Sequence, residues 1–409
     1  MGHTCKLALG FLGLCLWLPA ALFAGPLEEG LDAYAGGDFA KALALWRPLA
    51  EQGNAAAQFN VGILYERGQG TAADPAEAVR WYRSAAEQGK VAAQFNLAVL
   101  YERGQGVGQD YAAAVRWYKQ AAAQGNADAQ FSLGSLYDGG QGVARDEEEA
   151  AVWYRLAAEQ GDTDAQYNLA LKYAAGRGVP RDDVQAVEWY RRAAGQGDAA
   201  AQTNLGVMYE HGRGVARDHA QAARWYGQAA KQGDADAQFN LARLLAEGLG
   251  VPRDEAEAAR WYRLAAGQGN AMAQFNLAVA YSLGRGVARD EAEAARWYER
   301  AAEQGDSDAQ NNLGLLYDRG RGVARDAAQA ARWYRRAAER GNAAARYNIA
   351  AMYRKGEGVP RDDVRAYAWL LLAANDDAAA AAERDAMATA LTPAQIAEAE
   401  RVARTLEPN

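Results

Sequence analysis

Apolar and polar residues follow a pattern that repeats every 36 residues over most of the chain. One copy, residues 126–161, contains two apolar faces separated by a polar segment with two glycines. The first face, at i, i+4, i+7 and i+8, consists of Ala129, Leu133, Leu136 and Tyr137. The second, at i, i+3, i+4, i+7 and i+8, consists of Ala150, Trp153, Tyr154, Ala157 and Ala158. This spacing predicts two α-helices of about three turns in each copy. No part of the chain shows the alternation typical of a strand.

The register of this pattern never slips along the chain. A tryptophan recurs every 36 residues at Trp81, Trp117, Trp153, Trp189, Trp225, Trp261, Trp297, Trp333 and Trp369. A glutamine column runs with the same step from Gln58 to Gln310, and a glycine column from Gly53 to Gly341. Such periodicity indicates one supersecondary unit copied along the chain, each copy burying its apolar face against its neighbours. The predicted fold is all-α, an α-solenoid of antiparallel helix pairs.

Turn and cap residues predict where the helices of each copy begin and end. A Gly-Asp or Gly-Asn pair precedes the first helix in eight of nine copies, Lys90 being the exception. Glycine supplies the left-handed residue that ends one helix, and Asp or Asn caps the next. A Gly-x-Gly loop recurs in all nine copies and is followed by an aspartate, such as Asp146. We expect Asp146 to cap the second helix and Glu149 to complete a capping box.

The ends of the chain depart from the repeat and predict four segments. Residues 1–24 contain an apolar run, Leu7 to Ala24, behind the single charge of Lys6, which is typical of a signal peptide cleaved near Ala24/Gly25. A retained membrane anchor is the alternative. Residues 25–53 form a shortened capping repeat, 54–375 nine full repeats, and 376–409 C-terminal capping helices, the last opened by a capping box at Thr392.

Composition narrows the classes of function. Both cysteines, Cys5 and Cys15, lie in the predicted leader, so the mature chain has no thiol for a disulfide, a nucleophile or a metal site. Removal of Lys6 with the leader takes the formal net charge from −8 to −9. An acidic chain without a basic run is not suited to nucleic acid, where phosphate neutralisation supplies much of the affinity. We expect a periplasmic or secreted protein without a membrane span once the leader is removed.

Three recurring motifs resemble those of Sel1-like repeats, relatives of the tetratricopeptide repeat. They are Ala-x-Ala-Gln-Phe-Asn-Leu-Ala-x-Leu-Tyr, Gly-x-Gly-Val-x-Arg-Asp and Ala-x-Trp-Tyr-x-x-Ala-Ala-x-x-Gly, over about residues 54–375. The resemblance implies a right-handed superhelix with the first helix of each pair on the concave side, and a role as an adaptor or scaffold for proteins. Exported members with this pattern include regulators of membrane sensors and components of exopolysaccharide secretion. A branch linked to penicillin binding carries a disulfide in each unit, and this chain departs from it.

Few residues offer chemistry. The Gly-x-Gly loops lack the third glycine and the preceding strand of a dinucleotide site, so we interpret them as turns. His211 and His219, near Asp218, are interpreted as variation within a loop rather than as metal ligands. The five serines of the mature chain lie within the repeats, and none has a histidine beside it in sequence. We therefore predict no catalytic residues, no metal, no cofactor and no enzymatic activity.

An asparagine column is the main candidate for binding. It runs Asn60, Asn96, Asn168, Asn204, Asn240, Asn276, Asn312 and Asn348, with Ser132 as the exception. The column lies just off the buried stripe of the first helix, towards the presumed groove. An amide offers a donor and an acceptor and can hold the backbone of an extended peptide. Alternatively, each asparagine ties its own helix to the adjoining repeat or loop.

Columns that vary on the same face are candidates for specificity. One runs Phe59, Phe95, Phe131, Tyr167, Thr203, Phe239, Phe275, Asn311 and Tyr347. Another runs Ile63, Val99, Ser135, Leu171, Val207, Arg243, Val279, Leu315 and Ala351. The apolar members have packing as their alternative role. The departures Thr203, Arg243 and Asn311 are the residues expected to discriminate between partners.

Arginines also follow one edge of the predicted solenoid. They are Arg177, Arg181, Arg213, Arg217, Arg285, Arg289, Arg321, Arg325 and Arg361. Each has an Asp or Glu nearby in sequence, and we favour a solvated edge of such pairs over an anion-binding surface. The leading hypothesis is a scaffold whose groove binds a protein or extended peptide. The alternatives are a binder of cell-envelope glycan or peptidoglycan, using the aromatic column and the arginine edge, and an envelope hydrolase.

Overall fold

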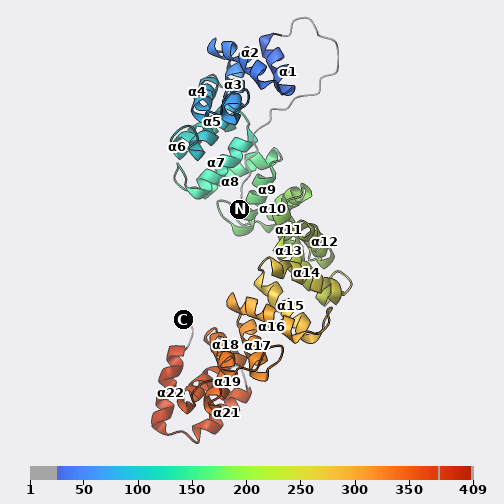
Figure 1. The fold of residues 1–409 in the computed structure, drawn as a ribbon, viewed down its shortest axis with the longest axis vertical. Coiled ribbons are helices and arrows are strands. Elements are labelled where there is room, and N and C mark those ends of the chain that lie inside the picture. The colour runs from blue at the N-terminus through green and yellow to red at the C-terminus, as the bar shows by residue number, and fades with distance from the viewer. Residues whose placement is uncertain (1–24, 376–377, 407–409) are drawn as a thin grey trace. The chain divides into compact units, whose positions relative to one another are not determined.

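The computed structural model describes residues 25–375 and 378–406, and every regular element in these ranges is an α-helix (Figure 1). The predicted signal segment, residues 1–24, lies outside the described residues. No helix in the described ranges is both long enough and apolar enough to cross a membrane.

The helices alternate between first and second members of pairs. The first helices are α1 (Pro26–Ala35), α3 (Ala55–Arg67), α5 (Val91–Arg103), α7 (Ala127–Gly139), α9 (Thr163–Ala175), α11 (Ala199–His211), α13 (Ala235–Glu247), α15 (Ala271–Leu283), α17 (Ser307–Arg319) and α19 (Ala343–Lys355). The second helices are α2 (Phe39–Glu51), α4 (Pro75–Glu87), α6 (Tyr111–Ala123), α8 (Glu147–Glu159), α10 (Asp183–Gly195), α12 (His219–Lys231), α14 (Glu255–Gly267), α16 (Glu291–Glu303), α18 (Ala327–Glu339) and α20 (Asp363–Ala373). Two further helices, α21 (Ala378–Ala388) and α22 (Pro393–Leu406), follow.

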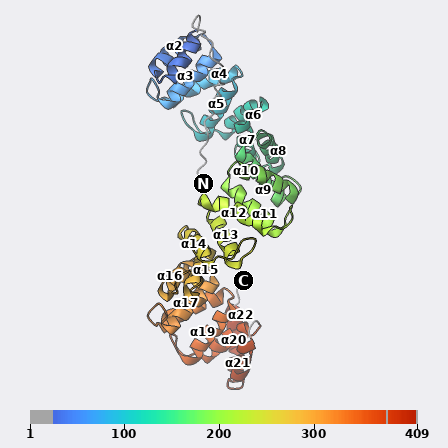
Figure 2. The same ribbon diagram turned by 90° about the vertical axis from the view of Figure 1, so that its right-hand side faces the viewer.

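The array divides into two compact units. One comprises the described residues up to Ala201 together with Arg213–Val215, and the other comprises Gln202–Gly212 together with the residues from Ala216 onward. From α1 to α10 in one unit and from α13 to α20 in the other, each first helix packs against its own second helix (Figure 2). The second helices α2 to α8 and α12 to α18 pack in turn against the first helix of the following repeat. The predicted architecture of antiparallel helix pairs is confirmed in both units.

The helix ends follow the predicted caps, with one correction. The Asp146 carboxylate accepts hydrogen bonds from the backbone N–H groups of Glu148 and Glu149 at 3.1 and 2.9 Å, as expected for an N-cap. The predicted return bond from Glu149 is wrong, because the Asp146 N–H donates to the Tyr137 carbonyl at 2.9 Å. The Glu149 carboxylate instead accepts from the Trp153 indole N–H at 2.9 Å. A complete capping box does form at Thr392 and Gln395.

The Gly-x-Gly loop is a structural turn with two separate demands. Gly140 has φ +68 and ends its helix in the left-handed conformation. Gly142 has φ +70, and a Cβ added there would lie 2.4 Å from the Tyr111 carbonyl carbon at the start of the preceding second helix. Only glycine meets the backbone angle and the close approach together. The interpretation of these loops as turns is therefore confirmed.

The core alternates small and large side chains. Ala150 and Ala157 of α8 are fully buried, as are Ala129 and Leu133 of α7. Alanine lets neighbouring helices approach closely, and the tyrosine beside each tryptophan, such as Tyr154 at 4% exposure, fills the space between them. The tryptophan column is less buried than its regularity suggests, since six of its nine members are half-buried.

A pair of glutamines links the first helix to the end of the second helix in seven of the nine full repeats. The Gln94 amide nitrogen donates to the Ala86 carbonyl at 3.1 Å, and the Gln124 amide nitrogen donates to the Gln94 amide oxygen at 2.8 Å. The same side-chain bond joins Gln58 to Gln88, Gln130 to Gln160, Gln166 to Gln196, Gln202 to Gln232, Gln238 to Gln268 and Gln274 to Gln304. The predicted glutamine column thus has a partner column 30 residues further along the same repeat, while the bond from Gln94 to Ala86 reaches the preceding repeat.

The two ends close the core with their own residues. At the start, Trp46 of α2 is 2% exposed and donates its indole N–H to the Leu27 carbonyl at 3.1 Å. At the other end, α21 and α22 pack against α20, whose Trp369 is 2% exposed. The Arg346 guanidinium takes the place of the column glutamine and donates to the Ala338 and Leu372 carbonyls.

Candidate interaction surface

The predicted asparagine column lies on the first helices α3 to α19. Seven of its members are half-buried, and Asn96 is buried at 5% exposure. We call this column, together with the residue before and the residue three positions after each asparagine, the asparagine face. It contains every partner-binding residue predicted from the sequence.

Two asparagines bond to their own helix. The Asn168 amide nitrogen donates to the Asp164 carbonyl at 2.9 Å, and the Asn276 amide nitrogen donates to the Met272 carbonyl at 2.8 Å. Each bond runs to the residue four positions earlier and leaves the amide oxygen for other partners. At these two positions the asparagine bonds within its own helix, which is the structural role considered as the alternative to peptide binding.

Other members of the column differ from one another. The Asn348 amide nitrogen donates to the Asn311 amide oxygen of the preceding repeat at 3.0 Å. Asn60 and Asn240 make no side-chain hydrogen bond with any residue that the structure describes. One sequence column therefore contains both structural ties and half-buried amides open to a partner.

Two asparagines contact tyrosines of the second helix. Burial raises the pKa of Tyr298 to about 12, and a hydrogen bond with the Asn312 side chain lowers it in part. The pKa of Tyr82 is likewise raised above its usual value, first by burial, while a hydrogen bond with Asn96 lowers it in part. Both tyrosines therefore remain neutral phenols at physiological pH.

The aromatic column beside the asparagines packs inward. The Phe59 ring lies 5.7 Å from the Tyr82 ring of its own repeat, centroid to centroid. Similar pairs are Phe95 with Tyr118, Phe131 with Tyr154, Tyr167 with Tyr190, Phe239 with Tyr262, and Phe275 with Tyr298. Because one side of each ring is taken by a tyrosine, this column serves packing first.

The predicted departures from the aromatic column make polar contacts. The Thr203 hydroxyl donates to the Asp234 carboxylate at 3.1 Å, so it reaches the cap of the following repeat. Asn311 accepts from Asn348. Where the ring is missing, the face therefore carries a polar link between repeats.

Arg243 is the charged departure on this face. Its guanidinium forms an ion pair with Glu210 of the preceding repeat and lies 3.7 Å from the Glu247 carboxylate. Glu210 also accepts a hydrogen bond from the Tyr226 hydroxyl at 2.9 Å. The side chain of Arg243 remains 27% exposed, so it stays within reach of a partner.

A cavity of about 220 Å³ brings two of the predicted residues together. It lies in the second unit between α13, α14 and α15, and both Arg243 and Asn276 line it. Ala246 stands here at the place of Glu210, and so the Tyr262 hydroxyl in the cavity wall lacks the carboxylate partner that Tyr226 has. Smaller side chains thus open a polar recess in the asparagine face.

The arginine edge is only partly neutralised. Arg213 and Arg181 both bind Asp183, at 2.9 and 3.0 Å, and their hydrogen bonds lower the pKa of that carboxyl. Arg289 pairs with Glu291 and Arg361 with Asp363, while Arg325 donates to the Asp318 carbonyl. The edge arginines that form no ion pair with any described residue are Arg177, Arg217, Arg285, Arg321 and Arg325. The favoured pairing with carboxylates thus holds for four of the nine.

A buried lysine was missed at the sequence level. Lys172 of α9 is 2% exposed, and its amine lies 2.6 Å from the Asp138 carboxylate of the preceding repeat. Leu64, Leu100 and Leu136 occupy the same place in the three preceding repeats. The signal available in the sequence was this single charge in an otherwise apolar column.

The histidines of the loop form no metal centre in the described residues. No group of three His, Cys, Asp or Glu side chains with suitable geometry occurs in the ranges that the structure covers. The His219 ring nitrogen Nδ1 is buried without a hydrogen-bond partner.

Comparison with known proteins was made for the family and for solved structures. A model of the Sel1 repeat matches residues 19–54, 55–90, 91–126, 127–162, 163–198, 199–234, 235–270, 271–306, 307–342 and 343–377. The match includes the segment that we predict to be a shortened capping repeat. A comparison with curated proteins found no match.

Two solved structures are similar over most of the chain. The protein c5321, a protective antigen present in uropathogenic Escherichia coli strains and displaying an SLR fold, is 37% identical, covers 93% of this chain and 83% of its own, and has a TM-score of 0.86. A Sel1 repeat protein from Oxalobacter formigenes is 36% identical over 79% of this chain and 92% of its own, with a TM-score of 0.59.

Proposed function

The chain belongs to the Sel1 repeat family, and on that premise we propose that it is an exported, non-enzymatic scaffold that binds a partner protein along its asparagine face. The repeat fold supports a protein–protein interaction scaffold. The proposal includes a location in the cell envelope and a role in regulating a sensor or a secretion system.

The cavity between α13, α14 and α15 is the observation that carries the proposal. It joins Arg243 and Asn276, which were singled out independently, in one recess of about 220 Å³. This volume is below the roughly 300–1,000 Å³ of small-molecule pockets. A recess of this size on a half-buried polar face suits one side chain of a partner protein better than a whole ligand.

The packing of the aromatic column favours a protein partner over a glycan. Sugar binding through aromatic platforms needs ring faces open to solvent. Phe95 and Phe239 are 1% and 8% exposed, the other rings of this column are half-buried, and Phe95 and Phe239 pack against tyrosines of their own repeats. The edge arginines without ion pairs would still suit an anionic polysaccharide, so glycan capture is kept as an outcome of the test.

The binding test uses the full chain as immobilised bait against a cell-envelope extract. Wild type is compared with a variant carrying Asn204→Ala, Asn240→Ala and Asn276→Ala. The matched control changes Arg224, Arg260 and Arg296 to Gln on the second helices of the same repeats.

We expect the asparagine variant, and not the control, to lose the specific protein band. Equal recovery by both variants with an intact helical spectrum would contradict binding at this face, and retention of peptidoglycan alone would favour the glycan alternative.

Export is tested separately. We expect cleavage close to Ala24/Gly25, because the apolar run ends there and charged residues follow. Fractionation of expressing cells and mass spectrometry of the purified chain measure location and N-terminus. A cytoplasmic protein that keeps residues 1–24 would remove export from the proposal and leave the scaffold function standing.

A further inference from the structure

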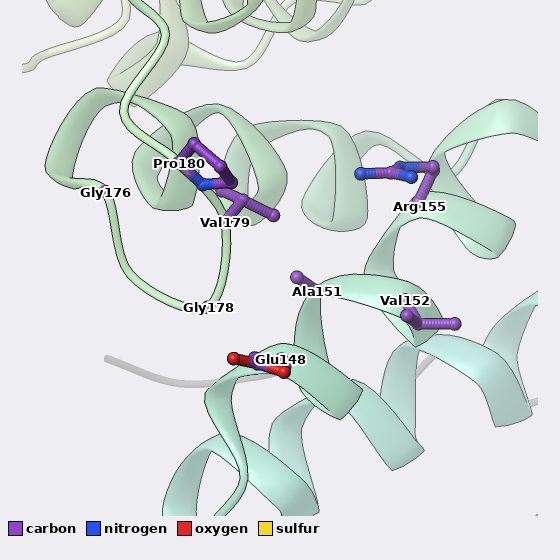
Figure 3. A pocket seen from close by; sticks show the side chains of 8 residues that line it. All are labelled: Glu148, Ala151, Val152, Arg155, Gly176, Gly178, Val179 and Pro180. Carbon is purple, nitrogen blue, oxygen red and sulfur yellow. The ribbon is translucent and has the colours of Figure 1, made fainter.

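A second surface lies in the unit that contains the residues up to Ala201. A cavity of about 600 Å³ opens there between α8 and the loop that follows α9 (Figure 3). It is lined by Glu148, Ala151, Val152, Arg155, Gly176, Gly178, Val179 and Pro180. This cavity is formed by α8, the second helix of its pair, and by a loop, whereas the asparagine face is formed by the first helices of the pairs.

Two departures from the repeat create this cavity. Seven of the other repeats have a charged side chain at the place of Val152, namely Arg80, Arg116, Glu188, Arg224, Arg260, Arg296 and Arg332. All of them have alanine or valine at the place of Glu148. The exchange removes a long side chain from the middle of the surface and places a carboxylate one helical turn earlier. Val152 is left 49% exposed.

The walls are apolar and the two ends are charged. Figure 3 shows Ala151 and Val152 on α8, with Val179 and Pro180 on the loop across the opening. Leu156, one turn beyond Val152, is also exposed, at 39%. An exposed valine and leucine one turn apart, on a helix whose other exposed side chains are charged, mark a surface for contact with another molecule.

Neither charge has a counter-ion within the described residues. Glu148 forms no ion pair there, and the Arg155 guanidinium donates only to the neutral Tyr173 hydroxyl, at 2.9 Å. Seven residues of helix separate the two, which is about 10 Å along the axis. That spacing is too long for the amino and carboxyl groups of one free amino acid and corresponds to about three residues of extended chain. The charge pattern therefore fits a polypeptide.

We propose that this cavity binds an aliphatic side chain of a protein partner, with a basic residue of the partner at Glu148 and an acidic residue at Arg155. The aliphatic group takes the place that an arginine stem covers in other repeats, between Val152 and the Val179–Pro180 loop. The two flanking charges fix the direction of the bound chain. Because different helices form the two surfaces, this binding is independent of the asparagine face.

The repeat itself supplies variants that should fold. Glu148→Ala with Val152→Arg gives α8 the residues that α6 and α12 already have at these places, Ala112 with Arg116 and Ala220 with Arg224. The variant fills the cavity with an arginine and removes its carboxylate. The loss of one buried aliphatic contact corresponds to about a tenfold weaker affinity or more.

A transplant tests sufficiency. The repeat around α18 already has Ala331, Arg335, Gly356, Gly358, Val359 and Pro360 at the places of the other six lining residues. Ala328→Glu with Arg332→Val would therefore recreate the eight lining residues in a different part of the chain, with Arg336 at the place of Leu156. Made in the Glu148→Ala/Val152→Arg background, these two changes should restore binding.

The probe is a phage-displayed library of random peptides selected on the immobilised full chain. We expect enrichment of peptides with an aliphatic residue between a basic and an acidic residue, about tenfold weaker binding by the Glu148→Ala/Val152→Arg variant, and recovery by the transplant. A selection that enriches no peptide, enriches peptides without this charge order, or gives equal binding by the variant would overturn the proposal. Loss without recovery would overturn the assignment of binding to these eight residues. Circular dichroism of each form shows that it is folded.

Discussion

The glutamine column and the asparagine column have the same period and lie two residues apart on the same helices, yet they behave differently. Gln94, Gln130 and Gln238 are 3–4% exposed, and each donates to the carbonyl at the equivalent place in the preceding repeat. Asn240 is half-buried with no side-chain bond in the described residues, and Asn276 bonds to its own helix. Regular spacing in the sequence thus does not by itself mean a shared structural role. Burial and identity of partner separate the residues that hold the array from those that face outward.

The largest expected effect concerns Lys172, a charge buried at 2% exposure among the packing residues. Lys172→Ala leaves the Asp138 carboxylate without its amine and opens a cavity in α9. We expect a local loss of about 3 kcal/mol, at the lower end for a broken buried pair because the Asp138 side chain keeps 33% exposure. Hydrogen exchange of peptides covering α7 to α9 measures it.

Lys172→Leu is the control for that loss, since it restores the leucine present at Leu136. It should lie within about 1 kcal/mol of wild type, because apolar replacement of a buried pair is often neutral. A loss of less than about 1 kcal/mol for the alanine variant would show that the pair adds nothing to packing.

The next effect tests the packing column directly. Gln238→Ala removes one donor from the Ala230 carbonyl, which keeps the Gly233 N–H, and one acceptor from the Gln268 amide, which keeps the Gly233 carbonyl. Two hydrogen bonds are lost at about 0.5–1.5 kcal/mol each. Exchange should accelerate in α12, α13 and α14, because the lost bonds join α13 to the end of α12 in the preceding repeat and to the end of α14 in its own repeat. A change confined to α13 would contradict the role of the glutamine pair as a joint.

A gain of stability is expected where the column is broken. Gln310 has a buried amide oxygen without a partner, because Arg340 stands at the place of the second glutamine. Arg340→Gln should supply the missing donor and stabilise this junction by about 0.5–1.5 kcal/mol. Slower exchange in α17 and α18 would show it. Unchanged exchange would mean that the pair contributes little even when complete.

The smallest expected effect is at the outward column. Asn240→Ala removes no hydrogen bond described in the structure, so stability should change by less than about 0.5 kcal/mol. Urea unfolding followed by circular dichroism, beside Gln238→Ala two positions earlier, gives the matched comparison. A loss equal to that of the glutamine variant would remove the distinction between the two columns.

Much of the fold could be predicted because each copy repeats the same local signals. Helix spacing, the left-handed glycines and the aspartate caps act within one repeat, and nine copies make each signal unmistakable. The capping box at Asp146 was predicted incorrectly because the tryptophan that competes for Glu149 is four residues further along the chain. Sequence spacing shows which groups are within reach but not which partner is preferred.

The candidate surface could be predicted only in part. The asparagine column, Thr203 and Arg243 lie on one face of the first helices, as expected, but their partners depend on packing between repeats. Lys172 and the cavity at Val152 were missed, although both show in the sequence as single departures within a column. Comparing each column member by member, as well as seeking what recurs, would have found them.

The glutamine joint has a consequence for how such a protein can change in length. Each joint uses one alanine carbonyl and two glutamine side chains, which nearly every copy carries. Any two interior copies can therefore form the same contacts with each other. Duplication or deletion of 36 residues therefore leaves every remaining junction intact. Surface residues such as Val152 are then found at a different position along the array. The exception is the last junction, where Arg346 binds the Leu372 carbonyl, so that the terminal segment cannot be exchanged with an interior copy. Genetic recombination can thus add, remove or reorder interior repeats, whereas the C-terminal segment has to stay at the end of the array.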